Sequence, residues 1–166
     1  MSRGRRGVLT EADRARETSM AFAKIGIEDV VMCDFEDTEL STQLNPIIRL
    51  LETQVREFKP TRIYTMFKGD RHQDHRTIYE ASAIACRSVP QLLGYETPSS
   101  YPNFLPTMFE DISEFLEQKV SALNCHVSQG DRLYMQHEKI SAAAHFRGAQ
   151  VDLGPSEGFI PYKYIL

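Results

Sequence analysis

A short apolar segment, residues 62–67, runs directly into a polar loop, residues 68–75, and then into residues 76–87, whose alanines favour a helix. Strand, loop and helix in this order form the unit from which parallel sheets are built. This unit constrains the fold more than any other feature of the sequence, because it assigns the chain to the α/β class.

The rest of the chain continues this alternation. Helices are predicted over residues 10–25, 42–58 and 112–123, with a last helix from residue 129 or 131 to 146. Strands are predicted over residues 29–33, 92–96 and 107–111, with an extended segment over residues 158–166. The order predicts a Rossmann-like three-layer fold, with a sheet of mostly parallel strands and flanking helices. Because doubly wound sheets normally open with a strand and this chain opens with a loop and a helix, we expect an N-terminally truncated version.

Length and composition favour one globular domain over residues 1–166, incomplete at its N-terminus. The chain has 166 residues, of which 42% are hydrophobic and 25% charged, and its net charge is −4. The acidic balance argues against a nucleic-acid partner. The sequence contains no apolar stretch long enough for a membrane span and no secretory signal. Three cysteines without a Cys-x-x-Cys spacing fit a reducing compartment, so a cytoplasmic location is expected.

The densest group of chemically active side chains is Asp-Arg-His-Gln-Asp-His at residues 70–75, where the predicted strand gives way to a helix. Ligands of open α/β sheets bind outside the carboxyl ends of the strands. Asp74 is predicted to cap the helix, so that His75 lies in the first turn, neutral and able to bind a metal such as zinc. His72 could then donate to a developing oxyanion, with Asp74 or Asp70 holding its tautomer. The spacing alone is equally consistent with a purely structural role, in which the loop only caps the helix and both histidines are solvated.

Several short motifs along nearly the whole chain, in this order and spacing, resemble the PIG-L/LmbE-like zinc-dependent deacetylases, which remove acetyl groups from N-acetylglucosamine-type sugars. The motifs are Ser2-Arg-Gly4, Arg14 with Glu17, Asp34-Phe-Glu-Asp37, the 70–75 segment, Phe104-Leu-Pro, Phe109-Glu-Asp-Ile112, His126-Val-Ser-Gln129, Arg147-Gly148 and Glu157-Gly-Phe159. Each is weak by itself, and the combination is specific.

The resemblance implies a site with one zinc ion. His75 is similar to the family's zinc ligand from the second half of the site. His72 is similar to the histidine that stabilises the tetrahedral oxyanion or protonates the leaving amine, and Asp74 looks like its orienting partner. The family commonly has His-Pro-Asp-His here, whereas this chain has Gln73 in place of the proline.

The substrate side is assigned in the same way. Asp37 is similar to the acidic residue that helps to hold the sugar, and Arg3 is a weaker candidate for a substrate contact. Asp70 is assigned to substrate binding with them. The expected substrate is a small amino-sugar conjugate whose attached group the sequence does not specify.

The family's opening motif, Ala-His-Pro-Asp-Asp-Glu, is not present in these 166 residues. In the family this motif supplies two zinc ligands and the general base. We expect either a reading frame that begins upstream of Met1 with this motif, or a non-catalytic remnant that binds a sugar or a partner. A missing opening strand would also expose a sheet edge, so a homo-oligomer is possible. The leading hypothesis is a zinc-dependent sugar N-deacetylase.

Overall fold

The computed structural model describes residues 11–166, which divide into two compact units. The helical unit comprises residues 11–37 and 110–157, and the sheet unit comprises residues 38–109 and 158–166. The single domain predicted over residues 1–166 stays a prediction.

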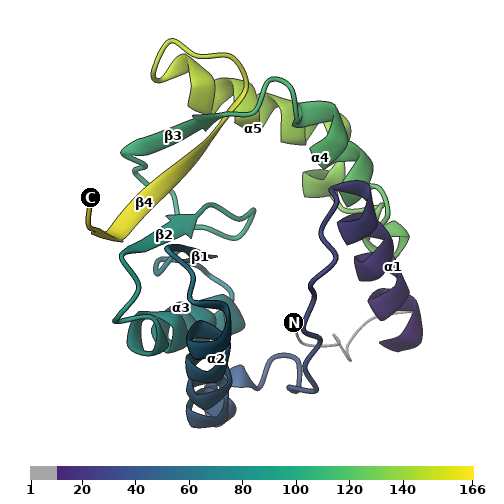
Figure 1. Cartoon of the computed structure of the whole chain (residues 1–166). Coiled ribbons are helices and arrows are strands. Elements are labelled where there is room, and N and C mark those ends of the chain that lie inside the picture. Colours follow the sequence, from purple (N-terminus) through teal and green to yellow (C-terminus); the bar gives the residue numbers. More distant parts are fainter. Residues whose placement is uncertain (1–10) are drawn as a thin grey trace. The chain divides into compact units, whose positions relative to one another are not determined.

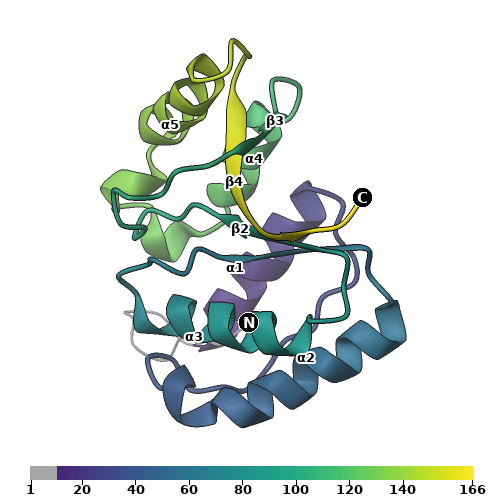
Figure 2. The same cartoon turned by 90° about the vertical axis from the view of Figure 1, so that its left-hand side faces the viewer.

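The sheet unit places two helices beside its strands. Its elements are η1 (Leu40–Gln43), α2 (Leu44–Phe58), β1 (Arg62–Met66), α3 (Gln73–Ala85), β2 (Gln91–Tyr95) and most of β4 (Ser156–Tyr164). Helix α3 packs against α2 and β1, and both views show α2 and α3 side by side (Figures 1 and 2). The apolar residues that recur every three or four positions in α2 supply one wall of a core. This core contains Ala85, Cys86, Val89 and Leu92, with Ile48, Leu51, Val55, Ile63 and Tyr162 packed around it.

The strands form one sheet in the order β1-β2-β4-β3, with β3 spanning Met108–Asp111. β1 and β2 are parallel, with Arg62 opposite Gln91 and Met66 opposite Tyr95, as the strand–loop–helix unit predicts. β4 runs antiparallel to β2, so the prediction of a mostly parallel sheet is wrong. The direction of a strand depends on the path by which the chain returns to the sheet, and the local residue pattern does not encode that path.

The helical unit contains the remaining helices. They are α1 (Glu11–Lys24), α4 (Leu116–Leu123), η2 (Val127–Gln129), η3 (Leu133–Met135) and α5 (His137–Ala149). Helix α4 packs against both α1 and α5 (Figure 1). The buried Glu17 of α1 accepts hydrogen bonds from the backbone N–H and the hydroxyl of Ser128, at 2.7 and 2.6 Å. A carboxylate therefore ties α1 to the chain segment that follows α4.

Most predicted elements are confirmed, and two differ. The helix predicted over residues 10–25 is α1, and the one over residues 42–58 is α2 with its short 3-10 extension. Residues 29–33 form no strand, because no described strand lies beside this segment to pair with it. Val31, in its middle, is 52% exposed. The last helix begins only at His137, because two 3-10 turns occupy part of residues 127–135. None of the helices in the described part of the chain has the length and apolar character that crossing a membrane requires.

Candidate functional site

The predicted 70–75 segment lies after the carboxyl end of β1 and spans the end of the connecting loop and the first turn of α3. His72 has extended backbone geometry (φ −76°, ψ 123°), and its Nδ1 accepts the backbone N–H of Asp74 at 3.2 Å. His72 is therefore the N-cap of α3, and the prediction that Asp74 caps this helix is wrong. The imidazole nitrogen replaces the side-chain oxygen that usually fills this role. His75 lies in the first turn of α3, as predicted.

Asp70 is the most buried polar residue of this site, with an exposed fraction of 0%. Its Oδ2 accepts the hydroxyl of Thr97 at 2.5 Å and lies 3.0 Å from Nδ1 of His75, while Oδ1 accepts the backbone N–H of His72 at 2.7 Å. Burial raises the pKa of Asp70, but the hydrogen bonds from Thr97, Ser99, His75 and the His72 backbone outweigh it and lower the pKa to about 2. Asp70 is thus an ionised carboxylate that only accepts hydrogen bonds.

The two histidines acquire opposite tautomers from these contacts. Because the ionised Asp70 has no proton to donate, Nδ1 of His75 carries a proton, and in the neutral tautomer this leaves the lone pair on Nε2. Nδ1 of His72 is an acceptor, so the proton of the neutral ring lies on Nε2. The rings stack with centroids 4.7 Å apart and 20° between their planes. The stacked rings therefore differ in which nitrogen carries the proton.

Asp74 supports the site by holding the backbone of a neighbouring chain segment. Its buried carboxylate accepts the backbone N–H of Thr38 at 2.7 Å and that of Leu40 at 3.4 Å. Its contact with His72 runs through its own backbone N–H rather than through the carboxylate. Gln73, at the position where the resembling family commonly has proline, donates through Nε2 to the carbonyl oxygen of Thr38 at 2.5 Å. Asp74 and Gln73 together hold the segment that begins at residue 38.

Asp37 and Arg3 are the two other residues predicted to contact the substrate. Arg3 is outside the described residues. Asp37 belongs to the helical unit and directly precedes Thr38 in the chain. Their assignments to the substrate stay predictions.

Residues from the loop after β2 also belong to the site. The sequence pointed to the loop from Thr97 to Pro106 only as a source of substrate differences, and it did not predict contacts of Thr97 and Ser99 with Asp70 and His75. Thr97 contacts Asp70, and the hydroxyl of Ser99 lies 3.3 Å from Nδ1 of His75. A usable signal was present, because Thr97-Pro-Ser-Ser follows the strand that neighbours β1, and carboxyl ends of parallel strands meet at one sheet edge.

His75 fits the role of a zinc ligand. A metal-binding histidine characteristically donates its other ring N–H to a carboxylate, which fixes the tautomer and orients the ring, as Asp70 does here. The structure describes the side chains of residues 14–166. Among these, no group of three or more His, Cys, Asp or Glu side chains could hold a metal ion. Since catalytic zinc sites use about three protein ligands, the described residues supply one fitted ligand rather than a complete donor set.

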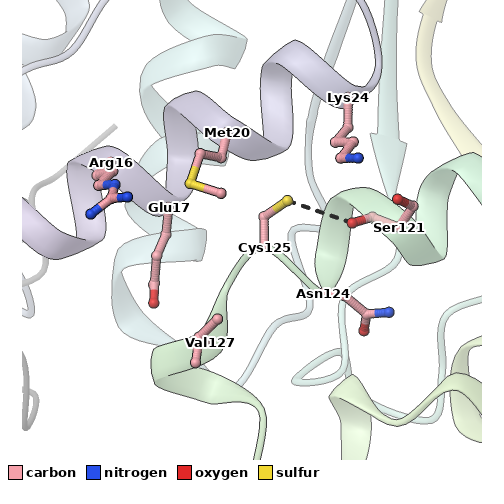
Figure 3. A pocket seen from close by; sticks show the side chains of 8 residues that line it. All are labelled: Arg16, Glu17, Met20, Lys24, Ser121, Asn124, Cys125 and Val127. Atoms are coloured by element: carbon pink, nitrogen blue, oxygen red, sulfur yellow. Dashed lines mark hydrogen bonds between the residues drawn. The ribbon is translucent and has the colours of Figure 1, made fainter.

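A separate cavity of about 570 Å³ lies within the helical unit, between α1 and the end of α4 (Figure 3). Its walls are formed by Arg16, Glu17, Met20, Lys24, Ser121, Asn124, Cys125 and Val127. The thiol of Cys125 donates weakly to the carbonyl oxygen of Ser121 at 3.6 Å, and both carboxylate oxygens of Glu17 are held by Ser128. The cavity contains none of the predicted site residues, so the candidate site is the His72–His75 pair.

Comparison with known proteins gives a family match and several relatives. Residues 2–86 match the PIG-L family model, GlcNAc-PI de-N-acetylase. The uncharacterized deacetylase YaiS of Escherichia coli is 40% identical over 134 residues, which cover 77% of this chain and 72% of that protein. The fold resembles N,N′-diacetylchitobiose deacetylase from Pyrococcus horikoshii, with a TM-score of 0.81 and 20% identity over 97% of this chain and 70% of the other. It also resembles the 4-carboxy-2-hydroxymuconate hydratase GalB from Pseudomonas putida, with a TM-score of 0.77 and 18% identity over 98% and 78%. Because a hydratase and a deacetylase share the fold, these structural similarities establish the fold alone.

Proposed function

Since the chain belongs to the PIG-L family, we propose that it is a zinc-dependent hydrolase that removes an N-acetyl group from an N-acetylglucosamine-type sugar conjugate. The proposal rests on one observation, the pair of stacked histidines with opposite tautomers. His72 offers a hydrogen-bond donor, and His75 offers a nitrogen lone pair that can bind a metal. The name of the Escherichia coli relative supports deacetylation. The alternative, a non-catalytic binding module, is not favoured by this relative, which is named a deacetylase.

His72 and His75 divide the chemistry between them. The Nε2–H of His72 hydrogen-bonds to the oxyanion that develops on the acetamide carbonyl. Water adds to this carbonyl carbon, the C–N bond then breaks, and a proton that the water gives up passes to the leaving nitrogen. Nε2 of His75 would hold zinc, which when bound supplies Lewis-acid polarisation of the acetamide carbonyl. Acetate and a free amino sugar are the products.

The proposed role of Asp70 and Asp74 is to orient the two histidines. Because Asp70 is fully buried and its oxygens are occupied, we assign it to orienting His75 rather than to touching the sugar. Asp74 orients His72 through its backbone N–H and holds the segment at Thr38, next to Asp37. Asp37 and Arg3 remain the proposed sugar contacts.

Exposed side chains of the loop after β2 are the proposed source of substrate specificity. Tyr101 and Leu105 are 48% and 73% exposed, and the backbone N–H of Tyr101 is anchored to the carbonyl oxygen of Gly69 at 2.9 Å. Because the backbone of Tyr101 is bonded to the segment that precedes His72, its ring can contact the group attached to the sugar, and Leu105 follows in the same segment. The free cysteines Cys33, Cys86 and Cys125 fit the proposed cytoplasmic location.

The test compares acetate release and zinc content in protein expressed from its complete reading frame. We expect acetate from N-acetylglucosaminides, loss of zinc in His75→Ala, and retained zinc with about 10²–10⁴-fold lower turnover in His72→Ala. The exposed His145 on α5 provides a control, because His145→Ala removes an imidazole outside the site. Equal loss of zinc in the His72 and His75 variants would refute the division of roles.

A further inference from the structure

We infer that Thr97, supported by Ser99, is a positioning residue that acts through Asp70 to hold the Nδ1–H of His75 and so to aim its Nε2. Its importance for zinc binding and catalysis rests on the proposed function. The hydrogen-bond arrangement itself does not, and it can be measured without zinc or substrate.

The Oδ2 atom of Asp70 receives two donors. The hydroxyl of Thr97 lies 2.5 Å from this oxygen and Nδ1 of His75 lies 3.0 Å from it. The Oδ1 atom is bonded to the backbone N–H of His72 at 2.7 Å. Both oxygens of the carboxylate are therefore fixed, and rotation about its Cβ–Cγ bond would break contacts on both sides at once. A carboxylate held in this way presents one oxygen to His75 in one direction.

Ser99 completes a chain of hydroxyl groups. Because the proton of Thr97 is committed to Asp70, the oxygen of Thr97 accepts, and the backbone N–H and hydroxyl of Ser99 lie 3.3 and 3.0 Å from it. The hydroxyl of Ser99 also lies 3.3 Å from Nδ1 of His75. The hydroxyl of Thr97 is thereby oriented by Ser99 on one side and by Asp70 on the other.

The backbone fixes the two loops to each other. The backbone N–H of Arg71 donates to the carbonyl oxygen of Ser99 at 2.9 Å, and that of Tyr101 donates to Gly69 at 2.9 Å. Asp70 and Ser100 form an antiparallel bridge, and the guanidinium of Arg71 donates to the carbonyl oxygens of Pro98 and Ser99, each at 3.2 Å. The loop after β2 is thus built to hold Thr97 against Asp70, although 27 positions separate these two residues.

A merely structural role and a positioning role predict different results. If Thr97 only satisfies a buried carboxylate, its loss lowers the free energy of unfolding and leaves His75 unchanged. If Thr97 positions His75, its loss frees the carboxylate to rotate, and the Nδ1–H exchanges faster with water. Outer-shell partners of metal ligands typically change metal affinity or activity by about 10–100-fold.

The experiment follows the ring nitrogens and the Nδ1–H of His75 by NMR in the zinc-free protein. Thr97→Val removes the hydroxyl and keeps the branched shape, and Thr97→Ser restores the hydroxyl. The matched control is Thr53→Val, which removes a half-buried, hydrogen-bonded hydroxyl from α2, outside the site. We expect a protected Nδ1–H in the wild type, in Thr97→Ser and in Thr53→Val. In Thr97→Val its exchange should be about tenfold faster, consistent with the loss of one charge-assisted hydrogen bond. Zinc affinity in the same protein should fall by about tenfold and recover in Thr97→Ser.

Exchange in Thr97→Val within about twofold of the wild type would overturn the inference, as would equal behaviour of the valine and serine variants. Should Thr97→Val fail to fold, Ser99→Ala decides instead, with faster exchange of the Nδ1–H expected and an unchanged rate contradicting the inference. If the wild type shows the protected Nδ1–H but binds no zinc and releases no acetate, the proposed function fails and the positioning of His75 stands.

Discussion

His72 combines two roles that can be separated by substitution. Its Nδ1 caps α3 by accepting the backbone N–H of Asp74 at 3.2 Å, while its Nε2–H is the proposed donor to the oxyanion. Loss of an N-cap acceptor costs about 1 kcal/mol. For a chain of 166 residues, this corresponds to a fall of about 2–4 °C in melting temperature in His72→Ala. His72→Asn keeps a side-chain acceptor at the cap, so its melting temperature should stay within about 1 °C of the wild type.

Both substitutions remove the imidazole, so both should lower turnover by about 10²–10⁴-fold while leaving zinc bound at His75. The assay is calorimetric unfolding together with acetate release and zinc content on the same samples. A stable and inactive His72→Asn would show that catalysis and capping are separate functions of one side chain. An asparagine variant as unstable as the alanine variant would refute the cap, and one with wild-type turnover would refute the catalytic role.

Three further predictions concern stability. Asp74→Ala leaves two backbone N–H groups without the carboxylate that accepts them, so the free energy of unfolding should fall by about 2–3 kcal/mol in urea titrations, and an unchanged midpoint would contradict this. Glu17→Ala removes both bonds to Ser128 and should cost about 2 kcal/mol, whereas Glu17→Gln, which can still accept one of them, should lose less. Burial, with a smaller contribution from the charge of Asp70, raises the pKa of Tyr95 from 10.0 to about 12. The unfolded chain therefore loses this proton first, stability falls between about pH 10 and 12, and Tyr95→Phe should show a smaller fall; parallel curves for the two proteins would refute this reasoning.

Elements whose pattern is local could be predicted from the sequence. Residues 42–58 carry apolar side chains at helical spacing, and the structure has α2 there. The position of His75 in the first turn of a helix also followed from local sequence. The direction of β4 did not, because strand direction depends on how the chain returns to the sheet. Residues 29–33 have strand-like composition, but a strand also needs a neighbour with which to pair, and no described strand provides one.

The candidate site was predictable in its residues and less so in its contacts. The 70–75 segment could be identified because two histidines and two carboxylates follow one strand closely. The cap was misassigned because histidine is not among the side chains that usually cap helices. The contact between Asp70 and Thr97 joins two loops that are far apart in the sequence, so it emerges only when β1 and β2 pair.

Acetate release from an N-acetylglucosaminide, measured in the zinc-loaded protein and in its His72→Asn variant, tests the proposed function most directly. Release of acetate by the wild type, with a loss of about 10²–10⁴-fold in a variant that keeps both its stability and its zinc, is the predicted result. Equal rates in the two proteins, or no acetate from any N-acetylated amino sugar tested, would contradict it.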